Sequence, residues 1–208
     1  MEKVNVLYED NHLIIVVKPA GILIDVLQDQ VKIYIKEKYK KPGNVFIGMI
    51  HQLDRNVSGI VIFAKTSKGA ARISEQFRRH AVEKVYEARI ENFDDLPEHG
   101  TLVNWLVHDE NKNITSVFDE EVQQSKYAEL SYKKIKDRVR IILKTGRQHQ
   151  IRAQFSYFGH PLLGDSKYGS KKIFDDKHIE LCAVSLSFTT ATGDEKKTIV
   201  YNATYGDK

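Results

Sequence analysis

The sequence contains a single cysteine, Cys182, among its 208 residues. One cysteine excludes an intramolecular disulfide framework and any zinc cluster built on cysteines. No apolar run approaches the roughly 18 residues that suggest a membrane-spanning helix. The opening segment, MEKVNVLYEDNHLIIVVKPAG, places acidic residues before its apolar run, which is not the order of a signal peptide. These absences predict a cytoplasmic protein without a membrane partner.

The common signatures of nucleotide, hydrolase and metal chemistry are also missing. There is no Walker phosphate loop, no Gly-x-Gly-x-x-Gly fingerprint and no Gly-x-Ser-x-Gly elbow. His51, His149 and His160 are scattered and none belongs to a His-x-x-x-His pair, so we predict no metal site. The enzymatic option that remains is acid, base or nucleophilic chemistry without a cofactor.

Basic residues are unevenly distributed, although the net charge is only +4. Residues 65–89 hold seven Lys or Arg against three acids, and residues 144–172 hold six against one. Between these segments, residues 109–121 carry five acids and one lysine. This order predicts a one-sided positive face suited to a polyanion such as nucleic acid. The alternative is that the lysines only keep the surface soluble.

Short apolar runs bounded by turn residues predict many strands. The predicted strands are residues 4–8, 13–17, 60–65, 84–90, 127–135, 138–143, 180–189 and 198–204. With few helices and no regular βαβ alternation, they predict an α+β fold with a mixed, mostly antiparallel central sheet flanked by helices and loops. Since no internal repeat or clear linker is present, we expect residues 1–208 to form a single domain.

Two helices follow from periodicity and capping. Ser67 can cap a helix that runs to about His80. A second helix is predicted to begin near Gln148, with three residues on one face, namely Ile151, Phe155 and Phe158.

Two further segments are less regular. Residues 28–40 (QDQVKIYIKEKYK) fit a short helix or an alternating strand. Residues 92–124 are polar and irregular, and we interpret them as an elaborated loop region.

Residues 51–66, HQLDRNVSGIVIFAKT, place Asp54 and Arg55 just before an apolar strand. The small residues Ser58 and Gly59 follow them. The aspartate is either a turn or capping residue, or the centre of an active site, and residue types alone favour the turn.

A second informative stretch is residues 145–169, TGRQHQIRAQFSYFGHPLLGDSKYG. Its Thr145-Gly146 turn leads into a helix start crowded with hydrogen-bond donors, where exposed amides favour an anion such as phosphate. Arg152 follows the inward-facing Ile151 and needs a carboxylate partner if it is buried. The alternative is a surface arginine whose stem packs on the core.

Four segments of the sequence resemble motifs of the RluA-type pseudouridine synthases, in the order found in that family. They are YEDNHLIIVVKPAG (8–21), HQLDRNVSG (51–59), KVYEAR (84–89) and LKTGRQHQIRAQFSYFGHPLLGDSKYG (143–169). The resemblance implies the pseudouridine synthase fold and the isomerisation of uridine in ribosomal or transfer RNA. Since the chain starts directly with these motifs, it implies the short form without an N-terminal S4-like RNA-binding domain.

The resemblance also implies three catalytic residues. Asp54 matches the catalytic carboxylate of the family. Tyr86 matches the tyrosine that stacks on the target uracil, and it is a candidate for removing the C5 proton, directly or through water. Arg152 matches the arginine that pairs with the catalytic aspartate. Because the reaction oxidises nothing and donates no group, no cofactor is expected.

RNA contacts are expected from residues beside these three. The set is Gln52, Arg55, Lys84, Arg147, His149, Gln150 and Ile151. Gln52 departs from the family, because many members have an arginine there that fills the gap left by the flipped base. A glutamine offers neither a positive charge nor a guanidinium plane, so flipping is assisted differently or the preferred RNA is already loose.

The partner is thus expected to be RNA rather than DNA, and the chain to be a monomer. A different class stays open: a non-catalytic RNA-binding or ribosome-assembly protein that retains the fold. A hydrolase with an aspartate nucleophile ranks last, because the sequence offers no clear group to activate water.

Overall fold

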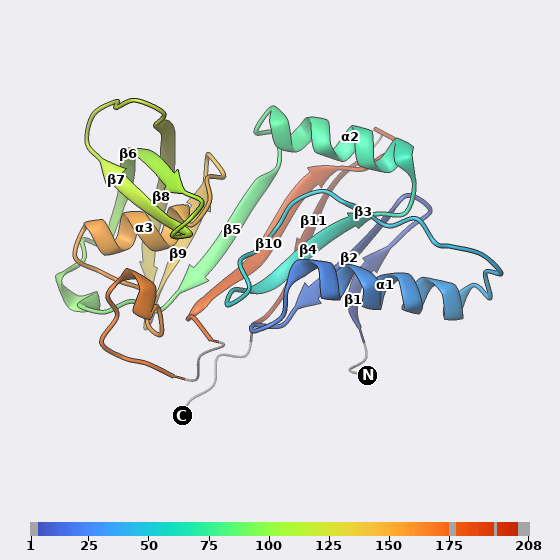
Figure 1. Cartoon of the computed structure of the whole chain (residues 1–208), viewed down its shortest axis with the longest axis horizontal. Helices are drawn as coiled ribbons and strands as arrows, with labels where there is room; N and C mark the ends of the chain where they lie inside the picture. The colour runs from blue at the N-terminus through green and yellow to red at the C-terminus, as the bar shows by residue number, and fades with distance from the viewer. Residues whose placement is uncertain (1–3, 175–177, 194, 204–208) are drawn as a thin grey trace. The chain divides into compact units, whose positions relative to one another are not determined.

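The computed structural model describes residues 4–174, 178–193 and 195–203. The chain divides into two compact units. The first is formed by residues 1–82 and 183–204, and the second by residues 83–182 and 205–208. Figure 1 labels the helices and strands of both units. A single catalytic domain over residues 1–208 stays a prediction.

The first unit is built on a sheet. Its strands are β1 (Asn5–Glu9), β2 (Leu13–Lys18), β3 (Gly48–Met49), β4 (Ser58–Ala64), β10 (Leu181–Thr189, in this unit from Ala183 onward) and β11 (Lys196–Val200). The strand order is β1-β2-β4-β10, with β3 on β4 and β11 on β10. The pairs β1–β2, β2–β4, β3–β4 and β10–β11 are antiparallel. All six residues of β2 are buried, as in a strand covered on both faces.

Helix α1 (Ile24–Lys38) resolves the ambiguity of residues 28–40 in favour of a helix as far as Lys38. Its buried residues recur at intervals of three and four, namely Ile24, Leu27, Val31 and Ile35. The first two of these lie outside the ambiguous window. The helical period is therefore visible only when the longer segment is read.

Helix α2 (Ser67–Arg78) begins where the sequence predicts a helix, but its cap is Thr66. The Thr66 hydroxyl accepts a hydrogen bond from the Gly69 amide at 3.1 Å, which satisfies one of the free amides of the first turn. The prediction that Ser67 is the cap is wrong, because Ser67 already has helical conformation. The helix ends at Arg78, two residues before the predicted end at His80.

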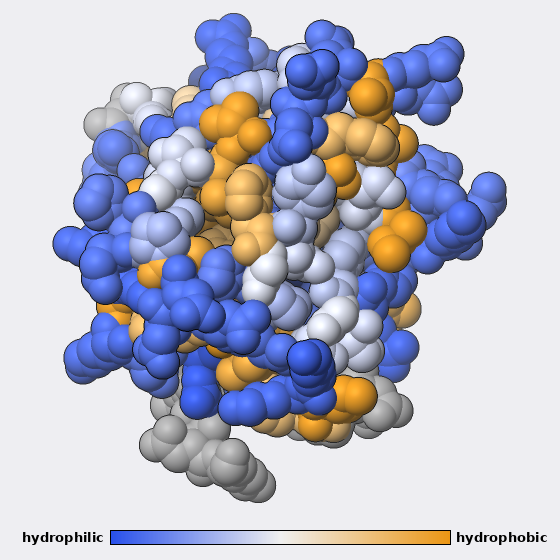
Figure 2. Space-filling view, turned by 90° about the vertical axis from the view of Figure 1, so that its left-hand side faces the viewer, coloured by the Kyte–Doolittle hydropathy of each residue, from blue (hydrophilic) through white to orange (hydrophobic). Residues whose placement is uncertain are grey.

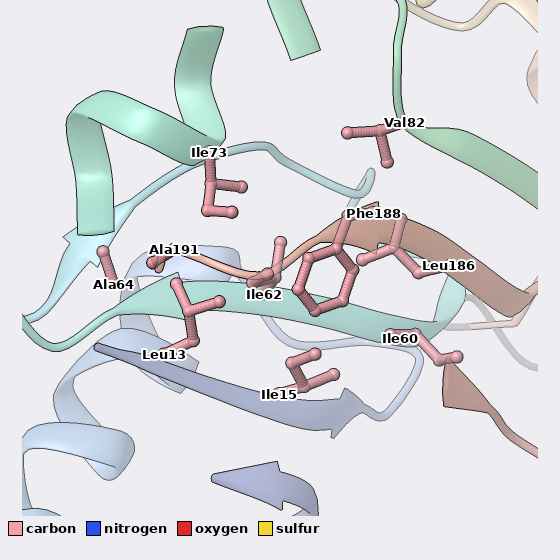
Figure 3. Packing of buried hydrophobic residues seen from close by; sticks show 10 residues of the cluster. All are labelled: Leu13, Ile15, Ile60, Ile62, Ala64, Ile73, Val82, Leu186, Phe188 and Ala191. Carbon is pink, nitrogen blue, oxygen red and sulfur yellow. The ribbon is translucent and has the colours of Figure 1, made fainter. Parts of the chain in front are cut away.

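The core of the first unit lies between its sheet and α2. Figure 3 shows Ile73 reaching from α2 toward the strands, with Phe188 of β10 beside Ile62 of β4. The complete cluster is Leu13, Ile15, Ile60, Ile62, Ala64, Ile73, Val82, Leu186, Phe188 and Ala191. Alternate residues of β2 and β4 enter it, because successive side chains of a strand point to opposite faces. Full burial of a side chain such as Phe188 contributes about 1.5–3 kcal/mol.

In its described residues, the second unit is a mostly antiparallel β structure with one α-helix. Its elements are β5 (Glu83–Ala88), η1 (Phe93–Asp95), β6 (His99–Asp109), β7 (Ile114–Phe118), β8 (Lys126–Ile135), β9 (Arg138–Leu143), α3 (Gln150–Tyr157) and η2 (Ser166–Tyr168). The strand order is β5-β9-β8-β6-β7, and the four pairings are antiparallel. The predicted β8–β9 hairpin and the α+β class are confirmed.

The interpretation of residues 92–124 as a loop region is wrong, because β6 and β7 form a hairpin there. Leu102, Asn104 and Leu106 of β6 are buried, while the residues between them are exposed or partly exposed. A strand with one solvated face needs apolar residues only at alternate positions. Asn104 hides the alternation, and its side-chain oxygen accepts a hydrogen bond from Gln154 of α3 at 2.9 Å. Figure 2 shows the β6–β7 side of the unit, where hydrophobic side chains stand in separate groups among hydrophilic ones.

Helix α3 begins at Gln150 instead of near Gln148. His149 has φ 54°, a left-handed conformation that cannot continue a right-handed helix. Ile151 and Phe155 are buried as predicted. Phe158 lies beyond the end of the helix and is 43% exposed, so its predicted place on the buried face is wrong.

At the end of β1, the side chain of Glu9 accepts four hydrogen bonds. Its Oε1 lies 2.6 Å from the Lys65 ammonium and 2.8 Å from the Tyr39 hydroxyl. Its Oε2 lies 2.7 Å from the Lys38 ammonium and 3.4 Å from the Tyr34 hydroxyl. Burial raises the pKa of Glu9, but the bonds from Lys38, Lys65 and Tyr39 outweigh burial and lower it from 4.5 to about 2.

We expect Glu9→Gln to lower the free energy of unfolding near neutral pH by about 1.5–3 kcal/mol, as hydrogen bonds to a charged group are lost. Because the pKa of Glu9 is lower in the folded chain, its contribution is complete above about pH 4.5 and is lost as the pH falls toward about 2. Urea unfolding of both forms across this range measures the difference. The exposed Glu37→Gln is the control, and an equal effect of both substitutions contradicts the assignment.

Candidate active site

The segment that carries Asp54 connects β3 to β4 and is held at several points. Leu53 and Val57, which flank Asp54, are buried. The Asp54 carbonyl accepts a hydrogen bond from the Val57 amide at 3.1 Å, which closes a turn. Upstream, His51 Nε2 accepts the Ile62 amide at 3.2 Å, and its ring stacks on Phe77 of α2 with centroids 4.8 Å apart. The loop therefore has a defined conformation at both ends.

Lys18, at the end of β2, is a buried cation next to this loop. Its ammonium has no exposed surface and donates to the carbonyls of Pro19 and Ile22, each at 3.0 Å, and of Arg55 at 2.9 Å. Burial lowers the pKa of Lys18, and the negative charge of Asp54 raises it, with a net value of about 8. Because the Lys18 ammonium is bonded to the carbonyl of Arg55, the residue after Asp54, this desolvated positive charge lies beside the Asp54 loop.

Residues 18–22 and the Asp54 loop are joined by backbone contacts as well. The Gly21 amide donates to the Arg55 carbonyl at 2.8 Å, and Arg55 Nε donates to the Gly21 carbonyl at 3.0 Å. Gly59 has φ 120°, and a Cβ there would collide with the backbone of Ala183. The small residue after the loop is thus required by the close approach of β10.

Sequence reasoning missed Lys18 as part of the site. The sequence did contain an indication, because Lys18 ends the apolar run Leu13–Lys18. A lysine in such a run is rarely buried unless its charge is paired. Of the predicted RNA contacts in this unit, Gln52 and Arg55 are both exposed. The Gln52 amide lies 3.4 Å from the Met49 sulfur.

In the second unit, Tyr86 lies on β5 opposite Ile141 of β9 and is 8% exposed. Lys84, two residues earlier, points to the same face of the strand. Its ammonium lies 3.5 Å from the Thr145 carbonyl. Burial lowers the pKa of Lys84, and the charge of Arg147 lowers it further. Two cations that destabilise each other favour a nearby anion.

The turn before α3 is shaped by Gln150, which is 3% exposed. Its side-chain oxygen accepts from the Thr145 hydroxyl at 2.8 Å and the Arg147 amide at 3.0 Å, and its amide donates to the Glu129 carbonyl at 3.1 Å. These contacts support a role in holding the turn. The predicted RNA contacts of Gln150 and of the buried His149 and Ile151 stay predictions.

Arg152 is buried and forms a bidentate ion pair with Asp165. Its Nε lies 2.7 Å from Oδ2 and its Nη2 lies 2.9 Å from Oδ1. Sequence analysis predicted a carboxylate partner for a buried Arg152 but did not identify Asp165 as that partner. The signal was available, since Asp165 is the one acid in residues 144–172.

Asp54 belongs to the first unit, whereas Tyr86 and Arg152 belong to the second. Their convergence in one cavity stays a prediction. In the part of the chain that the structure describes, no group of three or more His, Cys, Asp or Glu is arranged to hold a metal ion. Among the same residues, no helix has the length and apolar character needed to cross a membrane.

The fold is that of a pseudouridine synthase domain. The human structure "RNA Pseudouridylate Synthase Domain Containing 1" superposes with a TM-score of 0.78 at 23% identity, over 96% of this chain and 83% of that one. A family model described as RNA pseudouridylate synthase matches residues 12–157. The chain belongs to this family, and the resemblance stated from its four motifs is confirmed.

Two curated relatives show the range of the family. The "Ribosomal large subunit pseudouridine synthase C" of Buchnera aphidicola is 33% identical over 81% of this chain and 55% of its own length. The "tRNA pseudouridine synthase C" of Haemophilus ducreyi is 31% identical over 80% of this chain and 74% of its own length. The chain thus spans less than two thirds of several curated relatives.

Proposed function

We propose that this chain isomerises uridine to pseudouridine in structured RNA, with Asp54 as the catalytic carboxylate and without a cofactor. The observation that carries the proposal is the setting of Asp54 within the region matched by the family model. This acid stands on an anchored loop beside the buried ammonium of Lys18. A turn-capping aspartate would not need a desolvated cation near its carboxylate.

The reaction needs only a rearrangement of bonds. The N1–C1′ bond breaks, the uracil rotates, C5 bonds to C1′, C5 loses a proton and N1 gains one. The Asp54 carboxylate either attacks C1′ as a nucleophile or removes the C2′ proton to start a glycal route. Both routes require the ionised carboxylate, and the buried ammonium of Lys18 places a positive charge beside the loop that carries it.

We assign Tyr86 and Arg152 to the same reaction. The target base must leave its stack, which costs a few kcal/mol. Stacking on the Tyr86 ring returns about 1–3 kcal/mol, and its hydroxyl is assigned to accept the C5 proton directly or through water. Arg152 is assigned as the partner that donates a charge-assisted hydrogen bond to the Asp54 carboxylate.

Lys84 and Arg147 are the best supported RNA contacts. Burial and the positive charge of Arg147 both lower the pKa of Lys84. An RNA phosphate between them would relieve both effects. Relatives named for ribosomal and for transfer RNA make either a reasonable substrate class.

The test is pseudouridine mapping by carbodiimide labelling of total RNA from cells with and without the gene. We expect at least one ribosomal or transfer RNA site to lose its modification, and the purified protein to restore it on that RNA. RNA binding without turnover on any RNA that lost or lacks the modification would instead favour a binding or assembly protein with this fold.

A further inference from the structure

Arg152 is held from more than one side within the second unit. Besides the ion pair with Asp165, its guanidinium carbon lies 5.0 Å from the centre of the Tyr168 ring. Arg152 is 5% exposed and Asp165 is 1% exposed, so both charges are removed from water. A carboxylate and an aromatic face together fix the plane of the guanidinium as well as its direction.

Tyr168 is itself anchored through its hydroxyl. The hydroxyl accepts a hydrogen bond from the Thr115 amide at 2.8 Å and shares one with His149 Nδ1 at 2.9 Å. The Ser156 hydroxyl donates to the Tyr168 carbonyl at 2.6 Å. Tyr168, whose ring supports Arg152, is therefore tied to β7, to the residue before α3 and to the last turn of α3.

The geometry of the ion pair determines which part of Arg152 reaches another acceptor. Asp165 takes Nε and one N–H of Nη2, which is the side edge of the guanidinium. An arginine has five N–H donors in a fixed plane, so the end edge, made of Nη1 and the second N–H of Nη2, points to a direction set by Asp165.

A merely structural role explains this arrangement poorly. A buried ion pair is weak support for stability, since well-packed apolar residues of similar volume are often as good. Orientation is the property that a bidentate pair and a stacked ring supply and that apolar residues do not.

We propose that Asp165, with the Tyr168 ring, is a positioning residue that directs the end edge of Arg152 toward the reacting carboxylate. This rests on the proposed function, which makes Arg152 the partner of Asp54. Asp165→Asn keeps the shape of the side chain but presents an amide to one donor of Arg152. We expect it to lower kcat on the RNA by on the order of 10²-fold, with less than about a twofold change in RNA affinity.

The matched control is Glu87→Gln, which breaks an Arg140–Glu87 pair with an Nη2–Oε1 distance of 2.7 Å in the same unit. It should leave kcat unchanged. Tyr168→Phe keeps the ring below Arg152 and should reduce kcat less than Asp165→Asn. If Asp165→Asn is too unstable to assay, Asp165→Glu replaces it as the test of the proposal, because it keeps the charge but displaces the carboxylate by one methylene.

A wild-type kcat in a folded Asp165 variant overturns the proposal, even if the melting temperature falls. Equal losses of kcat in the Asp165 and Glu87 variants also overturn it, because a general structural effect then suffices. If the wild-type protein itself forms no pseudouridine on any RNA, the proposed function fails and this assignment falls with it. Wild-type turnover with unaffected variants rejects the assignment alone.

Discussion

Replacing Asp54 by asparagine is expected to lower pseudouridine formation by about 10⁴-fold or more, the range found when a nucleophile or essential base is removed. The amide can neither attack C1′ nor accept the C2′ proton, so both routes considered for this reaction are blocked. RNA binding should change little, because the amide keeps the size of the carboxylate. The measurement is single-turnover formation of pseudouridine with the protein in excess over RNA.

Asp29→Asn is the control for this experiment. Asp29 is an exposed acid of α1 whose carboxylate contacts Lys32, so its loss should leave turnover at the wild-type level. Circular dichroism of both variants checks the fold, since Asp54→Asn also removes the charge that raises the pKa of Lys18. Turnover by a folded Asp54→Asn protein within tenfold of wild type contradicts the catalytic assignment.

Sequence patterns predicted the parts of the fold that depend on local order. The strands near residues 4–8 and 13–17 and the β8–β9 hairpin are apolar runs closed by turn residues, and each is found within one or two residues. Motifs in family order predicted the family. Both kinds of signal lie in contiguous residues, which a single sequence displays directly.

The C-terminal strands show how far local order reaches. The strand predicted at residues 180–189 is β10, one residue shorter. The last strand begins at Lys196 instead of residue 198 and ends at Val200, and residue 204 of the prediction lies outside the described residues. Polar Lys196 and Lys197 are tolerated there because β11 is exposed at alternate positions.

What could not be predicted depends on contacts between distant residues. Lys18 is buried because three carbonyls surround its ammonium, and the Arg55 carbonyl among them is 37 positions away. Asp165 becomes the partner of Arg152 only after α3 and η2 have packed together. In β6, Asn104 is typical of a loop in the sequence, and only its hydrogen bond with the distant Gln154 explains why it is buried in a strand. A polar residue is assigned to the surface unless its partner is known.

The second large effect is expected at Tyr86, whose two assigned roles use different parts of the side chain. Stacking uses the ring, and removal of the C5 proton uses the hydroxyl. Proton transfer by a positioned side chain contributes about 10²–10⁴-fold, whereas stacking of a base contributes about 1–3 kcal/mol. Two substitutions therefore separate the roles.

We expect Tyr86→Phe to bind RNA normally and to form pseudouridine about 10²-fold or more slowly, because the ring remains and the hydroxyl is lost. With uridine deuterated at C5, this variant should show a primary isotope effect larger than that of the wild type, since loss of the C5 proton becomes the slow step. Tyr86→Leu should lose affinity for the flipped base as well.

Tyr132→Phe, a substitution of a buried tyrosine of β8, is the control and should behave as wild type. A Tyr86→Phe protein with wild-type rates would leave the ring as the sole contribution of Tyr86, and a Tyr86→Leu protein with wild-type rates would remove Tyr86 from the site altogether.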